Sequence, residues 1–189
     1  MTFATKITVG RLVMVPVFAV FAVLYGLSAG AGDPQEMYRW AAFWTFVIAA
    51  VSDGVDGWVA RRFHQQSELG AFLDPIADKA LVLTAVLILT IFQWGPDGWQ
   101  IPYWFAILVI LRDCVIIGGI RVVWSAKRDV EFRPHWTGKI ATFSLFFVLG
   151  WVMLRPSAIP PIFPCGIAAV FIFWSMMAYI RQGLQILRR

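Results

Sequence analysis

Six long apolar stretches, separated by short polar connections, organise the 189-residue chain. A helix rises 1.5 Å per residue, so each stretch is long enough to cross a hydrocarbon core about 30 Å thick. Residues that break helices, such as Gly30, Pro34 and Pro96, fall in the connections. The pattern therefore predicts six transmembrane helices, over residues 7–27, 37–61, 71–94, 101–124, 136–154 and 162–180.

The composition supports this interpretation, because 60% of the residues are hydrophobic and only 14% are charged. Soluble globular domains are far less apolar. We predict an all-α, polytopic membrane protein with a single membrane domain over residues 1–189 and no separate soluble domain. The two cysteines, Cys114 and Cys165, fall in different apolar stretches, where we expect two buried small residues and neither a disulfide nor a thiolate metal site.

The net charge of +5 is spread among the apolar stretches, which favours anionic lipid headgroups over nucleic acid as the partner. If alternate connections lie on opposite sides, all Lys and Arg residues except Arg39 and Arg155 fall on or toward one side. This asymmetry predicts that both termini and the connection at residues 61–70 face the cytoplasm. Tryptophans would form belts at both interfaces, the outer one with Trp40, Trp44, Trp94, Trp99, Trp104 and Trp151, the inner one with Trp58, Trp124 and Trp136.

The first stretch also imitates a signal peptide, because Lys6 and Arg11 precede an apolar core that ends in small residues at positions 28–31. Its apolar run is long for that purpose, and cleavage would leave five spans and break the charge asymmetry. We therefore expect a transmembrane helix here.

Four carboxylates interrupt some of the most apolar sequence. Asp53 and Asp56 are three residues apart near the end of the second predicted helix, and Asp74 and Asp78 are four apart near the start of the third, so each pair shares a helix face. Pro75 supports the helix start, since proline is tolerated in a first turn. The carboxylates should converge just below the cytoplasmic interface, where ionisable groups are costly and indicate function.

Two divalent cations would neutralise four carboxylates, and oxygen ligands without His or Cys favour Mg²⁺ or Mn²⁺ over zinc. Gly57 and Ala60 remove bulk beside the carboxylates, and Arg61 follows on the same side. A diphosphate would suit such a site, because it can bridge two metals while a guanidinium binds its remaining oxygens.

Two alternative roles fit the same residues. The carboxylates could form an ion pathway in a small transporter, and Gly57, Ala60 and Gly70 could be ordinary helix-packing or loop residues. Pairing of the carboxylates with Arg61 and Lys79 is less satisfactory, because two cations cannot neutralise four anions.

The spacing resembles the signature of the CDP-alcohol phosphatidyltransferases, Asp-x2-Asp-Gly-x2-Ala-Arg-x8-Gly-x3-Asp-x3-Asp. It is matched without departure by Asp53, Asp56, Gly57, Ala60, Arg61, Gly70, Asp74 and Asp78. The resemblance implies transfer of a phosphatidyl group from a CDP-linked lipid to an alcohol, with release of CMP and dependence on two Mg²⁺ or Mn²⁺ ions.

The resemblance also implies roles for individual residues. Asp53, Asp56 and Asp74 would be the principal metal ligands, and Asp78 would lie close to the metals and act as general base. The cytidine and diphosphate pocket would be lined by Gly57, Ala60, Arg61 and Gly70, with Thr8 from the first helix.

Recognition of the acceptor must come from outside the signature. Arg112 lies deep in the fourth stretch, where an arginine should face a polar cavity or a partner, while Asp113 points about 100° away around the helix. Lys139 and Arg181 lie near the inner ends of the fifth and sixth stretches. If all three face the cavity, the acceptor carries a phosphate group, and free serine or diacylglycerol is then a poorer candidate. The alternatives are an ion pair for Arg112 and, for Lys139 and Arg181, a side chain that extends to the membrane interface.

The sequence around the motif is most similar to the phosphatidylglycerophosphate synthase and cardiolipin synthase branches of the family. Asp113 in place of a glutamate, and Ala141 in place of a lysine before Thr142, favour the cardiolipin branch. Chain length and bacterial character favour the other. We expect glycerol 3-phosphate as acceptor, with phosphatidylglycerol as the alternative and an ion-coupled transporter as the alternative of another class. The resemblance further suggests a bacterial inner-membrane location and a homodimer, which the helix patterns do not decide.

Overall fold

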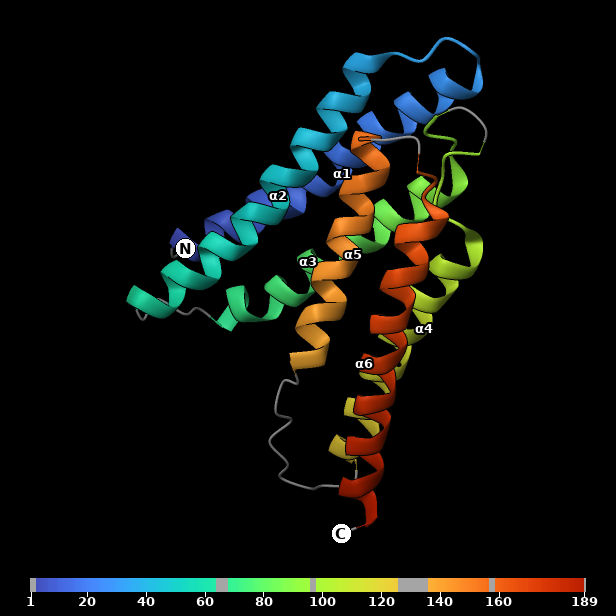
Figure 1. Ribbon diagram of the computed structural model, residues 1–189. Helices are drawn as coiled ribbons and strands as arrows, with labels where there is room; N and C mark the ends of the chain where they lie inside the picture. The colour runs from blue at the N-terminus through green and yellow to red at the C-terminus, as the bar shows by residue number, and fades with distance from the viewer. Residues whose placement is uncertain (1–2, 64–67, 96–97, 126–135, 157–158, 189) are drawn as a thin grey trace. The chain divides into compact units, whose positions relative to one another are not determined.

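In a computed structural model the chain forms helices joined by short connections (Figure 1). The structure describes residues 3–63, 68–95, 98–125, 136–156 and 159–188. Over these ranges it has six helices, which confirms the predicted all-α fold. They are α1 (Phe3–Gly30), α2 (Glu36–Phe63), α3 (Glu68–Ile91), α4 (Tyr103–Ser125), α5 (Trp136–Leu154) and α6 (Ile162–Arg188).

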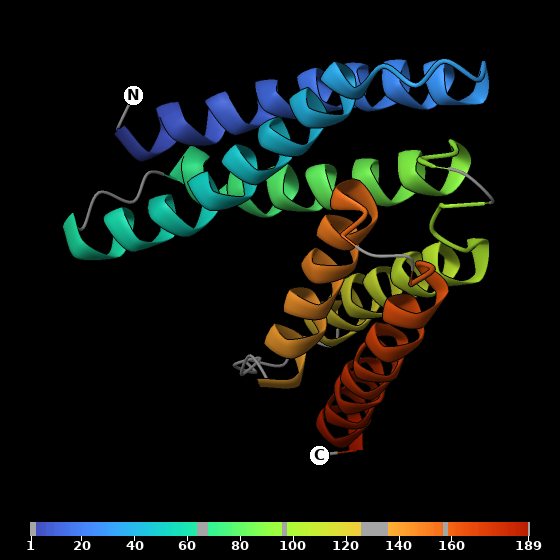
Figure 2. The same cartoon turned by 45° about the horizontal axis from the view of Figure 1, so that its top comes forward.

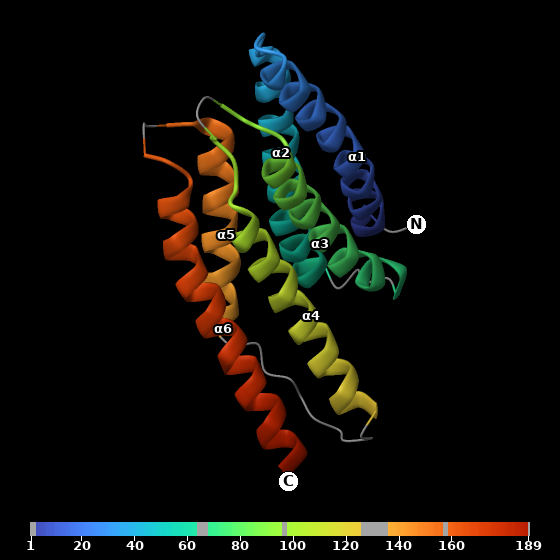
Figure 3. The ribbon, with the colours of Figure 1, turned by 90° about the vertical axis from the view of Figure 1, so that its right-hand side faces the viewer.

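The helices belong to two compact units, named here unit 1 (Met1–Gln100) and unit 2 (Ile101–Arg189). In unit 1, α1 packs along both α2 and α3 (Figure 2). In unit 2, α6 packs against both α4 and α5 (Figure 3). That the whole chain acts as one membrane domain stays a prediction.

Three described stretches are long and apolar enough to cross a membrane, namely Gly10–Gly30, Trp136–Leu154 and Ile162–Gln185. A fourth apolar stretch, Lys79–Ile91, is shorter. Their length and composition identify an integral membrane protein.

The core of unit 1 is built on helical repeats of four and seven residues. Phe18 and Tyr25 of α1 are fully buried, and the Phe18 ring packs on Phe46 of α2 with 5.6 Å between the ring centroids. Burying a side chain of this size contributes roughly 1.5–3 kcal/mol. Other buried positions of α2 and α3 recur at three- and four-residue spacing along one face of each helix: Ala42, Ala49, Ala77, Leu81, Ala85 and Leu89.

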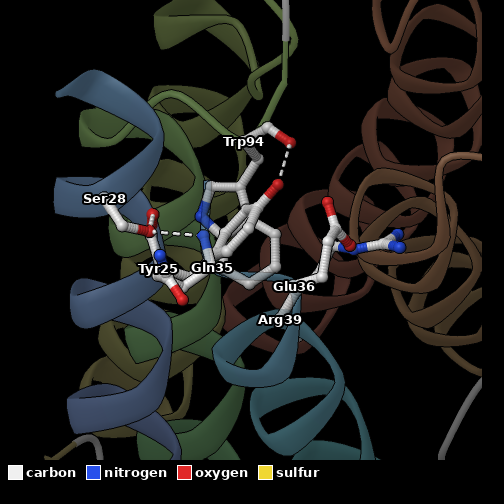
Figure 4. Close-up of polar contacts among 6 residues, drawn as sticks. All are labelled: Tyr25, Ser28, Gln35, Glu36, Arg39 and Trp94. Carbon is white, nitrogen blue, oxygen red and sulfur yellow. Dashed lines mark hydrogen bonds and ion pairs between the residues drawn. The ribbon is translucent and has the colours of Figure 1, made fainter. Parts of the chain in front are cut away.

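At the end of unit 1 where α1 joins α2, hydrogen bonds connect α1 to Trp94 and to the segment that leads into α2 (Figure 4). The Tyr25 hydroxyl donates to the Trp94 carbonyl oxygen over 3.4 Å, and the two rings lie 4.8 Å apart. Ser28 Oγ accepts from the Gln35 N–H over 3.1 Å and donates to the Tyr25 carbonyl oxygen over 2.8 Å. Gly32, at φ +82°, lets the chain turn between the helices in a conformation that L side chains disfavour.

Trp94 is fully buried against Tyr25, so its predicted place in the outer tryptophan belt is wrong. Its large apolar surface is used for packing in unit 1. The prediction of two buried cysteines holds for Cys165 and fails for Cys114, which is exposed on α4; both are free.

Unit 2 has a groove of about 730 Å³ on its surface between α5 and α6. Its lining is almost wholly apolar and includes the exposed rings of Phe143, Phe147 and Phe163. The Oγ of Ser144, the hydroxyl in this lining, is satisfied because it donates to the Ile140 carbonyl oxygen over 2.8 Å. Such a surface suits contact with hydrocarbon.

Gly26 of α1 is tightly packed, because a Cβ there would overlap the Cβ and Cγ atoms of Phe92, the residue that follows α3. These atoms lie near the backbone and cannot swing away. We predict that Gly26→Ala lowers stability by about 1–3 kcal/mol. Thermal unfolding of the purified protein in detergent would measure this as a lower Tm.

Gly10→Ala on the same helix is the matched control, because a Cβ there meets nothing within 4 Å. Its Tm should not fall, since alanine is the better helix former. Equal Tm values for the two variants would contradict the close approach.

Candidate active site

The structure places the acidic motif on the two arms of one helical hairpin. Asp53 and Asp56 lie on α2, and Asp74 and Asp78 lie on α3. Gly57, Ala60 and Arg61 also belong to α2, Gly70 belongs to α3, and Thr8 belongs to α1. The side chains of all these residues lie outside the described part of the structure, so their contacts stay predictions.

Helix geometry brings the two pairs of aspartates to matching levels. Asp53 lies ten residues before the last residue of α2, and Asp78 lies ten residues after the first residue of α3. Ten residues of helix correspond to about 15 Å, so both positions are equally far from the hairpin connection. Asp56 and Asp74 lie seven and six residues from it, or about 10 Å. α2 and α3 contact each other. The predicted convergence of the four positions on one end of the hairpin is therefore consistent with the helix bounds.

Periodicity also indicates which helix faces carry these positions. Two turns of helix are close to seven residues, so positions seven apart share a face. Each aspartate lies seven residues from a buried core residue on its own helix: Asp53 from Phe46, Asp56 from Ala49, Asp74 from Leu81 and Asp78 from Ala85. The motif thus continues the buried stripes of α2 and α3.

Pro75 was expected in the first turn of a third helix over residues 71–94, and it lies farther from the helix start than predicted. α3 starts at Glu68, which puts Pro75 two turns into the helix. Proline has no N–H, so the carbonyl group four residues earlier, at Ala71, receives no helical hydrogen bond from it. Helices of membrane proteins tolerate this loss where another group can satisfy the carbonyl. Pro75, which causes the missing hydrogen bond, directly follows Asp74 of the motif.

Arg11 of α1 is the residue of this region that the sequence pattern did not single out. It is 1% exposed and ranks among the largest fully buried side chains. Counting charges by membrane side placed it with the other cytoplasmic cations. A second signal was present in the sequence, because Arg11, Phe18 and Tyr25 follow one another at seven-residue spacing along a single helix face.

The three predicted acceptor residues lie in unit 2, on three different helices. Arg112 of α4 is partly buried, and its Nη1 lies 3.5 Å from Asp113 Oδ1. A long ion pair of this kind was the alternative to a cavity-facing Arg112. The Nε of Arg112 is buried and, among the described residues, finds no hydrogen-bond acceptor.

Lys139 and Arg181 are exposed on α5 and α6. The Lys139 ammonium lies 5.2 Å from the centre of the Trp136 ring, at cation–π distance. Their exposure agrees with the snorkelling alternative, and it also leaves both charges accessible to an anionic molecule.

Further polar atoms are buried in unit 2 without a hydrogen-bond partner among the described residues: Thr137 Oγ1, Ser175 Oγ and Gln182 Oε1. Ser175 is fully buried, and Gln182 lies seven residues farther along the same face of α6. The sequence pattern gave no sign of these residues, because single polar residues in an apolar helix are common. A buried polar atom without a partner costs free energy, and a bound polar molecule would recover it.

Among the side chains that the structure describes, no group of three or more His, Cys, Asp or Glu residues could hold a metal ion. The four motif aspartates lie outside that set. The acidic motif contains four carboxylates, the kind of oxygen ligand that a hard divalent cation prefers.

The sequence pattern of the CDP-alcohol phosphatidyltransferase family matches residues 1–180. The chain belongs to this family. The predicted resemblance is confirmed, and it extends from the acidic motif to almost the whole chain.

Curated bacterial relatives agree with this assignment. A protein of Escherichia coli strain K12 is 32% identical over 182 residues, which cover 93% of this chain and 91% of the relative. A protein of Shigella flexneri serotype 5b is 32% identical over 185 residues with the same coverage. Both are named CDP-diacylglycerol--glycerol-3-phosphate 3-phosphatidyltransferase.

Proposed function

We propose that this protein transfers the phosphatidyl group of CDP-diacylglycerol to glycerol 3-phosphate, forming phosphatidylglycerophosphate and releasing CMP. The complete signature from Asp53 to Asp78 on one helical hairpin carries the proposal. Family membership supports the reaction class, and the relatives' names support this acceptor. The reaction is a step of phospholipid biosynthesis.

Two Mg²⁺ or Mn²⁺ ions would be held by Asp53, Asp56, Asp74 and Asp78; the helix bounds, which give the four positions matching levels on the hairpin, and the hard oxygen donors support this. Bound divalent cations would polarise the phosphoryl oxygens and offset the charge that develops on them. The first three aspartates would serve as ligands alone, and Asp78 would have a second role.

In the proposed reaction the acceptor's hydroxyl oxygen attacks the phosphorus atom that carries the diacylglycerol. A new P–O bond forms, the bond from that phosphorus to the CMP phosphate oxygen breaks, and CMP leaves. Asp78 would take the proton that the hydroxyl loses. A carboxylate in this role contributes typically about 10²–10⁴-fold to the rate.

The donor would bind along α2. Gly57 and Ala60 leave room for the nucleotide to approach the helix, and Arg61 would pair with the diphosphate oxygens. Gly70 of α3 and Thr8 of α1 would complete this pocket. These residues all belong to unit 1.

The acceptor phosphate would bind to basic groups of unit 2. Arg112 is best suited, because burial of its Nε without an acceptor among the described residues leaves a donor for an anion. Lys139 and Arg181 are exposed and would add charge. The buried polar atoms of Thr137, Ser175 and Gln182 offer partners for glycerol hydroxyl groups.

Phosphatidylglycerol is the alternative acceptor, favoured by Asp113 and Ala141 where the first branch would carry glutamate and lysine. The names of the curated relatives favour glycerol 3-phosphate. An ion-coupled transporter is disfavoured by membership of a transferase family. We further propose six membrane spans, both termini in the cytoplasm, the bacterial inner membrane as location, and a homodimer.

The acceptor can be identified with purified full-length protein in detergent, CDP-diacylglycerol and Mg²⁺. We expect CMP release with glycerol 3-phosphate and none above background with serine or inositol phosphate. CMP release with phosphatidylglycerol instead would establish the alternative branch. No release with any acceptor would contradict the enzymatic function.

Asp78→Asn tests the proposed general base. The amide cannot take a proton, so kcat should fall about 100-fold or more, while the Kd for CDP-diacylglycerol stays near the wild-type value. Turnover and lipid binding would be measured on the same preparation. Equal loss of both would make Asp78 an essential ligand and exclude the separate role as base.

Arg112→Met tests acceptor binding. Loss of a charge-assisted hydrogen bond to phosphate should raise the KM for glycerol 3-phosphate about tenfold or more and leave the KM for CDP-diacylglycerol unchanged. Arg155→Met, in the connection between α5 and α6, is the matched control and should change neither value. An unchanged KM for glycerol 3-phosphate in Arg112→Met would reduce Arg112 to a partner of Asp113.

A further inference from the structure

Arg11 is a permanently charged side chain buried among three apolar helices. It is 1% exposed on α1, the helix that packs along both α2 and α3. A guanidinium does not lose its proton in proteins, so it cannot become neutral when it is buried. Its removal from water costs several kcal/mol unless anionic groups lie close to it.

The contact between Phe18 and Phe46 fixes the register of α1 against α2. The helices run antiparallel, so each step back along α1 matches a step forward along α2. Seven residues before Phe18 is Arg11, and seven residues after Phe46 is Asp53. Seven residues are close to two whole turns, so position 11 lies on the same face of α1 as Phe18, and position 53 lies on the same face of α2 as Phe46. Position 53 therefore lies opposite Arg11.

The approach of Gly26 to Phe92 fixes the register of α1 against α3 in the same way. These two helices run in the same direction (Figure 3). Fifteen residues before Gly26 is Arg11, and fifteen before Phe92 is Ala77, which is 1% exposed. Asp78 is the next residue along α3. Arg11 thus lies at the level where both helices carry an acidic residue of the motif.

We propose that Arg11 is a positioning residue of the acidic motif, a fixed countercharge at the level of Asp53 and Asp78 that offsets their negative charge. This inference rests on the proposed metal site. The four carboxylates contribute a formal charge of −4, Arg61 of the same motif offsets one unit of it, and Arg11 offsets another. The same positive charge opposes a bound divalent cation, so Arg11 also keeps the affinity for the cation lower than the carboxylates alone would give.

Arg11→Met separates this role from simple packing. Without Arg11 the cation-free protein carries one more unit of unbalanced negative charge at the motif, which a bound cation relieves. Saturating Mn²⁺ should therefore raise the Tm of Arg11→Met by about 5 °C or more beyond the rise seen in the wild type. Mn²⁺ titration by calorimetry should give a Kd at least about tenfold lower than the wild-type value. Both are measured on purified full-length protein in detergent without substrate.

Arg39→Met is the matched control. Arg39 lies on the same face of α2 as Phe46 but at the opposite end, with a side chain 12% exposed and an ion pair to Glu36. Its loss should lower the Tm equally with and without Mn²⁺ and leave the Kd unchanged. Arg11→Lys keeps the charge and should behave as the wild type.

If Arg11→Met does not fold, Arg11→Gln provides the same measurements with a polar side chain of similar length. An increase in Tm with Mn²⁺ no larger than that of the wild type would overturn the inference and leave Arg11 a packing residue. If the wild type itself fails to bind Mn²⁺, the proposed metal site fails. A wild type that binds Mn²⁺ beside variants that bind it equally well overturns the countercharge alone.

Discussion

Charge within a low-dielectric helix core is the constraint on which unit 1 depends. By helical periodicity the positions of the acidic motif share the helix faces that bury Phe46, Ala49, Leu81 and Ala85, so we expect the motif to continue the core pattern of the hairpin. An ionised group in such a place must be compensated by hydrogen bonds or opposite charge. Arg11 is a fully buried cation on α1, the helix that packs along both arms of the hairpin. Its burial makes sense only with anions close to it.

The two ends of unit 1 meet this constraint in different ways. Where α1 joins α2, the packing is neutral: the Tyr25 ring packs at a tilt against Trp94, its hydroxyl donates a hydrogen bond to the Trp94 carbonyl oxygen, and Gly26 lets Phe92 approach. At the other end the same three helices carry Arg11 and the acidic motif. The neutral end can hold the helices in register whatever the state of charge at the acidic end. A site that exchanges charged substrates requires a frame of this kind.

Much of the fold was predictable because hydropathy records which residues avoid water. The six apolar stretches gave six helices, and the spacing of the aspartates identified the family. Contacts around each helix were less accessible. Pro75 suggested a helix start because proline favours first turns, yet the preceding residues Glu68 to Gly70 already form α3. Trp94 was assigned to an interface on its amphipathic ring, whereas its packing partner Tyr25 is 69 residues away in the chain.

Arg11 and Arg112 show the same limit for charged residues. A count of basic residues by membrane side records their depth and not the direction in which each side chain points. Arg11 proved to be buried among helices, and Arg112 proved to lie beside Asp113 despite the angle between adjacent positions on a helix. The acceptor residues are the hardest to infer, because Arg112, Lys139 and Arg181 come from three helices and share no sequence motif.

The contact between Phe18 and Phe46 has a consequence for how this protein can change over evolution. Two helical turns separate each ring from the charged position on its own helix. One inserted or deleted residue in either segment would rotate that position by about 100° and carry it off the shared face. Side chains in these segments can be exchanged one at a time, whereas their length cannot change. Natural variation in chain length should therefore collect in the connections, and the two segments should stay free of insertions and deletions in every functional relative.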